Sequence, residues 1–151
     1  MKFFTRSCAN GESTEEEAAA VPESYRHYLA KLDLPPPIAA LSRVNTHDAY
    51  VLSVEHQPER SRLSVQLRCG DLQRGYSDVT IAFSFVTIDS TALETLQHAV
   101  RPARVEVLYD EIDRSGECFV YRLLLFPSGE VNIGFRHVDL AERPVADRSS
   151  F

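Results

Sequence analysis

The chain of 151 residues is 44% apolar and 25% charged, and its 22 acidic and 16 basic residues give a formal net charge of −6. This length and composition predict one domain, residues 1–151, whose core is large enough to need no metal or disulfide staple. The basic residues form no run, so we expect neither a nucleic-acid partner nor a membrane surface, because both attract clustered cations.

The three cysteines, Cys8, Cys69 and Cys118, are an odd number without C-x-x-C spacing. A disulfide framework or a zinc site needs pairs at short intervals, so we expect reduced thiols and no cofactor. No segment has the length of a signal peptide's apolar region or of a membrane span, which requires about 20 apolar residues. These features predict a cytoplasmic protein, and nothing in the sequence selects an oligomeric state.

The N-terminal part is predicted to be helical over residues 14–44, after a poorly ordered segment at residues 1–13. Ser13 or Thr14 can cap a first helix, with three glutamates following in its first turn, and Pro22 is expected to interrupt that helix. A second helix is then predicted from an apolar face at helical spacing, and it stops at prolines 35–37. The residues of that face are Tyr25, Tyr28, Leu29 and Leu32.

Residues 47–140 alternate between apolar and polar side chains and are predicted to form an antiparallel sheet. The predicted strands cover residues 50–55, 63–69, 79–85, 104–112, 118–126 and 130–138. Residues 90–100 are either a short helix or an irregular crossover, and residues 141–151 are predicted to be a poorly ordered tail. The fold class is therefore α+β, with an N-terminal helical segment followed by a curved sheet or partial barrel of about six strands in meander order.

Four carboxylates lie within the eight residues E-V-L-Y-D-E-I-D at positions 106–113. Strand alternation places Glu106 and Asp110 on one face, with Leu108 and Ile112, and places Glu111 on the other face with Val105, Val107 and Tyr109. The two carboxylates of the first face are about 13 Å apart along the strand, too far to chelate one ion directly. Any site in this stretch therefore needs residues from neighbouring strands.

One hypothesis for this stretch is a metal or acid/base site. If the last two hairpins place Val120 opposite both Asp110 and His137, these two residues share a face two strands apart. His47, at the start of the first strand, would complete a His47, Asp110 and His137 set suited to a divalent metal, and Glu111 would extend it for acid/base chemistry. No chelating H-x-H, H-x-x-x-H or H-E-x-x-H pair accompanies these residues.

Other residues indicate binding without chemistry. Arg74, Tyr76 and Asp78 lie beside Gly75 in a predicted loop, where exposed arginine and tyrosine are typical interface anchors. The alternative is a loop whose tyrosine covers the end of the core. Arg122, in a strongly predicted strand, is expected to pair with Asp110 or Glu111 across the sheet, and such pairing explains the acidic residues structurally.

Several motifs resemble a family of small bacterial proteins known only as a domain of unknown function. They are M-K-F-F-T at the start, H-D-A at 47–49, C-G-D-L-Q-R-G-Y-S-D at 69–78, L-Y-D-E at 108–111 and L-L-F-P-S-G-E-V-N-I-G-F-R at 124–136. The resemblance spans most of the chain from about residue 45 and assigns no role to any residue. Related small acidic proteins have been proposed as immunity partners of toxins, so the resemblance implies a protein-binding role.

Charge and motifs together favour a non-enzymatic module that binds a basic protein, such as a toxin. The binding residues predicted on this hypothesis are Arg74, Tyr76, Asp78, Asp110, Glu111 and Arg122. The alternative is a metal-dependent or acid/base enzyme that uses His47, Asp110, Glu111 and His137. A small-molecule binder in the mouth of the curved sheet stays open as a third possibility.

Overall fold

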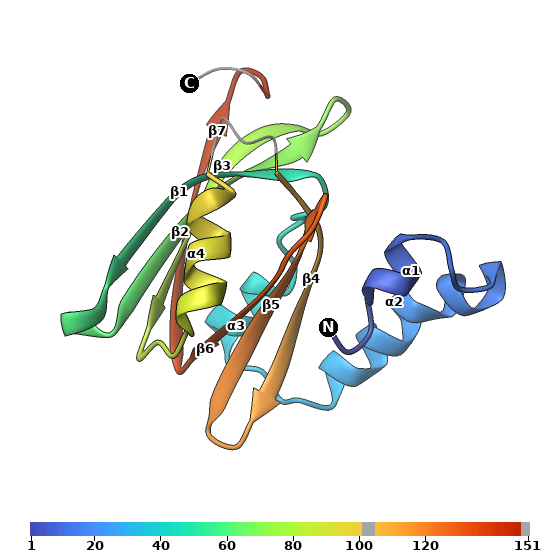
Figure 1. Cartoon of the computed structure of the whole chain (residues 1–151), viewed down its shortest axis with the longest axis horizontal. Helices are drawn as coiled ribbons and strands as arrows, with labels where there is room; N and C mark the ends of the chain where they lie inside the picture. The colour runs from blue at the N-terminus through green and yellow to red at the C-terminus, as the bar shows by residue number, and fades with distance from the viewer. Residues whose placement is uncertain (101–104, 149–151) are drawn as a thin grey trace.

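The computed structural model describes residues 1–100 and 105–148. Within them, four α-helices and seven antiparallel strands form an α+β fold with one curved sheet that does not close (Figure 1). The predicted fold class is therefore confirmed. Residue 104, where a strand was predicted to begin, and residues 149–151 of the predicted tail lie outside the described residues. No helix in the described part is long and apolar enough to cross a membrane.

The N-terminal helices are α1 (Arg6–Ala9), α2 (Glu15–Ala30) and α3 (Pro36–Leu41). Thr14 caps α2: its hydroxyl accepts from the Glu17 N–H, and the Glu17 carboxylate accepts from the Thr14 N–H. The prediction that Pro22 interrupts this helix is wrong, because α2 continues through it. Since α2 has no buried residue, water reaches the carbonyl that the proline leaves without a donor.

The sheet contains one strand more than the sequence predicts. Its members are β1 (Ala49–Gln57), β2 (Arg62–Asp71), β3 (Gly75–Ser84), β4 (Glu106–Ser115), β5 (Cys118–Phe126), β6 (Glu130–Phe135) and β7 (His137–Val145). A short 3₁₀ turn, η1 (Pro58–Arg60), joins β1 to β2, and α4 (Ser90–His98) joins β3 to β4. The predicted strand 130–138 is divided at Arg136, and β7 continues into the region where a tail was expected.

The strand order is β6-β5-β4-β1-β2-β3-β7, which differs from the predicted meander. The first three strands form one meander and the next three another, but β4 crosses back to β1 and β7 pairs with β3. The β1–β4 contact contains only two residue pairs, Ala49 with Val107 and Tyr50 with Glu106. The two halves of the sheet therefore splay apart below this contact and face each other (Figure 1).

The core fills the space between these halves. Phe83 of β3 packs against Tyr121 of β5 and Phe135 of β6, with ring centroids 5.7 and 5.0 Å apart. A bridge between Thr87 and Gly134 links the chain after β3 to β6. Helix α3 lies against β7, and α4 lies against β6 and β1. The sides left open by the splayed sheet are thus covered, and the apolar inner faces are removed from water.

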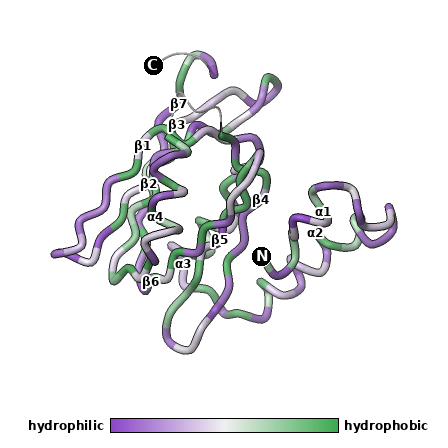
Figure 2. The backbone as a smooth tube through the Cα atoms, in the orientation of Figure 1, coloured by the Kyte–Doolittle hydropathy of each residue, from purple (hydrophilic) through white to green (hydrophobic). Residues whose placement is uncertain are grey.

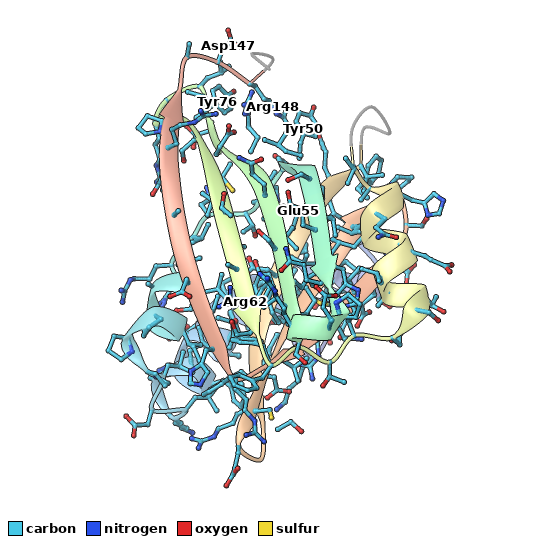
Figure 3. All side chains as sticks on the ribbon, turned by 90° about the vertical axis from the view of Figure 1, so that its left-hand side faces the viewer. Tyr50, Glu55, Arg62, Tyr76, Asp147 and Arg148 are labelled. Carbon is cyan, nitrogen blue, oxygen red and sulfur yellow. The ribbon has the colours of Figure 1, made fainter. Side chains whose placement is uncertain are left out.

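The opposite face of β1, β2, β3 and β7 is polar and looks toward the viewer in Figure 3, where Glu55 and Arg62 mark it. In this orientation α4 lies to one side of the face and the N-terminal helices lie behind β7. Antiparallel sheets tolerate one solvated face because alternate side chains can all be polar.

Candidate functional site

A β-bulge in β4 decides which side chains of the acidic stretch face inward. The pairing with β5 shifts register between Val107 and Tyr109, so Leu108 has no partner. Asp110 and Glu111 lie on opposite faces, as predicted. The prediction that Val107 and Tyr109 share a face is wrong, because the bulge leaves Val107 on the core face with Asp110 and turns Tyr109 outward.

Glu111 is almost completely buried, although it lies on the outer face of the sheet. Its carboxylate accepts hydrogen bonds from the backbone N–H groups of Lys2, Phe3 and Phe4 at 2.7, 2.6 and 2.6 Å. Only 1% of the side chain is exposed, because the N-terminal segment covers it. The predicted binding residue Glu111 therefore holds residues 2–4 against the sheet and is not available to a partner.

Arg122 lies directly opposite Glu111 on β5. Its guanidinium nitrogen is 2.9 Å from a carboxylate oxygen of Asp113 and 3.9 Å from one of Glu111. The predicted pairing with a neighbouring carboxylate is confirmed for Glu111 but not for Asp110, which faces the other way. Arg122 thus neutralises two acidic side chains on the face that the N-terminal segment covers.

The N-terminal segment and α2 add aromatic rings beside β4. Phe4 stacks on Tyr109, with ring centroids 4.9 Å apart and planes 11° apart, and meets Tyr25 of α2 edge-on at 5.4 Å. The Tyr25 hydroxyl accepts a hydrogen bond from the Ile112 N–H at 2.6 Å. This contact lies on the part of β4 that extends beyond β1, so Tyr25 satisfies a backbone donor that no strand pairs.

Asp110 lies at a hollow of about 190 Å³ that these elements enclose, here called the Asp110 hollow. The buried Thr46 hydroxyl donates a hydrogen bond to the Asp110 carboxylate. The Tyr121 hydroxyl lies deep in the core beside the Asp110 carboxylate and the Thr46 hydroxyl. The hollow is lined by Phe4, Tyr25, Ser42, Val44, Asn45, Thr46, His47, Leu108, Tyr109 and Asp110.

Burial raises the pKa of the Asp110 carboxyl from an ordinary value of 3.8 to about 6, although the Thr46 hydrogen bond opposes the change. Burial, followed by the charge of Asp110, raises the pKa of the Cys69 thiol to about 12 and that of the Tyr121 phenol well above its ordinary range. Both groups are therefore neutral at physiological pH, whereas the Asp110 carboxyl changes its charge near pH 6.

Replacing Asp110 with asparagine is expected to change how stability depends on pH. The folded state binds the Asp110 proton more tightly than the unfolded chain, so the group adds stability below its ordinary pKa of 3.8, and this stability is lost as the pH rises through about 6. The shift from 3.8 to about 6 corresponds to about 3 kcal/mol. Urea unfolding at several pH values should show that, as the pH rises from about 4 to about 6, the free energy of unfolding of Asp110→Asn increases relative to that of wild type. Asp139→Asn, at an exposed carboxylate of β7, is the matched control, and equal pH dependence in wild type and Asp110→Asn contradicts the prediction.

The structure brings together only part of the predicted metal set. His47 lines the Asp110 hollow, with its ring nitrogen Nδ1 3.1 Å from an Asp48 oxygen. His137 lies on β7, paired with Ser84, because Val120 is opposite Asp113 and Gly134 instead of Asp110 and His137. The three-ligand set is therefore wrong. Within residues 1–100 and 105–148, no group of three His, Cys, Asp or Glu residues is placed to hold a metal ion.

Of the three predicted binding residues of the β2–β3 hairpin, two line a hollow and one is buried. Arg74 and Tyr76 line a second hollow of about 480 Å³ between this hairpin, β7 and the segment that follows α3. Asp78 is buried and accepts two hydrogen bonds from the buried Arg68, at 2.7 and 3.1 Å, and one from Arg143 at 3.2 Å. Asp78 is thus a structural residue, and its prediction as a binding residue is wrong.

Sequence reasoning missed Phe4, Thr46 and Arg68. Phe4 lies in a segment predicted to be poorly ordered, yet two adjacent phenylalanines need a surface to cover them, and this was an available signal. Arg68 pairs with Asp78 through the register of a hairpin whose turn is marked by Gly70 and Gly75, so the pair was deducible. Nothing in the sequence links Thr46 to Asp110, because they meet only through the fold.

Comparisons of the chain with protein-family models, with curated proteins and with solved structures found no match. The resemblance to a bacterial family stays a prediction, and function is argued from the geometry of the chain itself.

Proposed function

We propose that the chain is a binding module for a basic partner protein and that the acidic arm formed by residues 7–25 is its docking element. The carrying observation is how the charge is distributed. Residues 7–25 contain five glutamates and no lysine or arginine, whereas the remaining positions hold 17 acidic and 16 basic residues. Nearly the whole net charge of −6 therefore belongs to one short segment.

The arm also projects from the sheet. Helices α1 and α2 stand to one side of the strands in Figure 1, and the far end of the arm, where α2 begins, is hydrophilic in Figure 2. The glutamates at this end are exposed, and the helix between them and the sheet has no buried residue. They are Glu12, Glu15, Glu16, Glu17 and Glu23.

Attachment of α2 to the sheet depends on its C-terminal half. Tyr25 accepts from the Ile112 N–H, and the Tyr28 hydroxyl donates to Asp113. The N-terminal half depends on the Thr14 cap for its order, since it packs against nothing in the core. Exposed like charges on a protruding helix steer an oppositely charged surface during encounter and oppose like-charged ones, which favours a basic partner.

Removing charge from the arm is expected to weaken partner capture strongly. The variant Glu15→Gln/Glu16→Gln/Glu23→Gln removes three charges and keeps Glu17, which the cap requires. Its retention of basic proteins from native extract should fall roughly tenfold or more relative to wild type, because long-range attraction scales with the charge removed. Quantitative mass spectrometry of proteins retained by tagged bait measures this change.

The matched control for this test is Glu55→Gln/Glu59→Gln/Asp139→Asn, which removes the same number of exposed carboxylates from the sheet and the β1–β2 turn. The control should retain what the wild type retains. If wild type captures no specific protein, or if the control loses the same proteins as the arm variant, the proposal fails.

A second candidate function is acid–base catalysis at Asp110. The supporting observation is that Asp110 and His47 line one hollow and that burial raises the pKa of Asp110 to about 6, near the value that a general base needs. Glu111 and His137, predicted to take part, lie elsewhere. Hydrolysis of activated esters by wild type and Asp110→Asn, measured across this pKa, tests the candidate, and equal rates count against it.

A further inference from the structure

The Asp110 hollow lies at the base of the acidic arm. Tyr25, which forms one wall, belongs to α2, whose first turn carries three of the five glutamates of the arm. Phe4 forms a second wall and is held in place by the bond from its backbone N–H to Glu111. A surface drawn to the arm by its charge therefore arrives beside this hollow.

The walls are aromatic. Phe4 and Tyr109 stack on each other, Tyr25 meets Phe4 edge-on, and the His47 ring stands edge-on to Tyr109 at 5.6 Å between centroids. The faces of phenylalanine and tyrosine rings carry negative electrostatic potential and attract organic cations. Together with Asp110, this lining favours a positive group and disfavours an anion.

Among the described residues, the largely buried Asp110 has no cationic partner. No lysine or arginine of the described residues lines the hollow, and none of them forms an ion pair with Asp110. The donors beside the carboxylate are neutral: the Thr46 hydroxyl, which bonds to it, and the buried Tyr121 hydroxyl, which lies next to it. Buried carboxylates are normally paired, so the cluster has an unused capacity for a positive donor.

We propose that the Asp110 hollow binds a cationic side chain, lysine or arginine, presented by the basic partner, with the charged end directed at Asp110 and the alkyl stem against Phe4, Tyr25 and Tyr109. The volume of about 190 Å³ suits one side chain rather than a larger ligand. This inference rests on the proposed function, because the partner is the one that the arm attracts.

Small cations test the hollow without the partner. The full chain is titrated with Nα-acetyl-lysine N-methylamide and the arginine equivalent, and the neutral norleucine equivalent is the control ligand. Backbone amide shifts in NMR spectra report where each probe binds. We expect the cationic probes to bind at millimolar concentration, to shift residues of the Asp110 hollow, and to bind at least about tenfold more tightly than the neutral probe.

Two variants assign the binding to this hollow. Asp110→Asn keeps the shape and removes the charge, so affinity for the lysine probe should fall about tenfold, whereas Asp139→Asn should change nothing. Phe4→Leu removes one ring and should weaken binding by a smaller factor. Equal binding of the norleucine probe, unchanged affinity in Asp110→Asn, or absence of any shift in the hollow overturns the inference.

The outcomes separate this inference from the proposed function. If the lysine probe fails but the arm variant still loses its basic partners, the arm proposal stands and the inference about the hollow is overturned. If the probe binds wild type and not Asp110→Asn, the hollow is a cation site even when the arm variant captures the same proteins as wild type.

Discussion

Glu111→Ala is expected to lower the free energy of unfolding by about 3 kcal/mol, because three backbone donors lose a buried, charged acceptor. The three bonds are no longer than 2.7 Å, and the side chain is only 1% exposed. Residues 2–4 should separate from the sheet, and Phe4 should leave the wall of the Asp110 hollow. Urea unfolding gives the energy, and hydrogen exchange of the Lys2, Phe3 and Phe4 amides reports the release.

A graded variant sharpens this prediction. In Glu111→Gln the amide oxygen can still accept from Phe3 and Phe4, while the amide nitrogen faces the Lys2 N–H, so the loss should be about half as large. Glu106→Gln changes a partly exposed carboxylate of the same strand and serves as the control, with an expected cost below about 1 kcal/mol. Wild-type protection of the three amides in Glu111→Ala would show that other contacts hold the segment.

Asp78→Ala is expected to destabilise the fold by about 4 kcal/mol, because it leaves Arg68 buried without its paired carboxylate. Arg68 is 4% exposed and Asp78 is 3% exposed, so neither charge can be solvated by a small movement. Arg143→Ala removes the third, 76% exposed member of the group and should cost less than about 0.5 kcal/mol. Thermal and urea unfolding of the two variants give the comparison.

Two further measurements test the cause. Replacing both buried charges, as in Arg68→Met/Asp78→Leu, should recover most of the loss, because apolar residues of similar size need no partner. The hydrogen bonds from Arg68 hold the pKa of Asp78 below its ordinary value of 3.8, so the stability it contributes is present above that value and is lost as the pH falls through the lower, folded-state pKa. The difference between wild type and Asp78→Ala should therefore shrink in acid. A constant difference, or a double variant as unstable as Asp78→Ala, would show that buried charge is not the cause.

Local patterns predicted most of the elements. Alternation located the strands, Thr14 was among the two predicted caps, and the helix at residues 90–98 was one of two alternatives. The strand order was not predictable in this way, because α4 allows β4 to cross to β1 and the periodicity of β4 is the same whichever strand lies beside it. The register of the last hairpins differed from the prediction by three residues at Val120, which moved His137 away from Asp110.

The candidate site was also predictable only in part, because local periodicity does not show which distant segments lie beside a strand. Asp110 and His47 were identified from residue type and position, and both line one hollow. Three other features could not be predicted, because each depends on residues distant in the chain. They are the bulge at Leu108, the N-terminal segment that covers Glu111, and the hydrogen bond from Thr46 to Asp110. The predicted break at Pro22 was wrong because α2 is exposed, and water can replace the hydrogen bond that the proline removes.

The sequence by itself determined the α+β class, the concentration of glutamates in residues 7–25 and the opposite directions of Asp110 and Glu111, because composition and strand periodicity act over a few residues. The tertiary structure alone decided that Glu111 anchors the N-terminal segment while Asp110 lines an aromatic hollow that no lysine or arginine of the described residues lines. The burial and the partners of a side chain depend on which distant segments cover its face of the sheet. Glu111 is therefore structural, whereas the adjacent Asp110 is the carboxylate proposed to bind a partner.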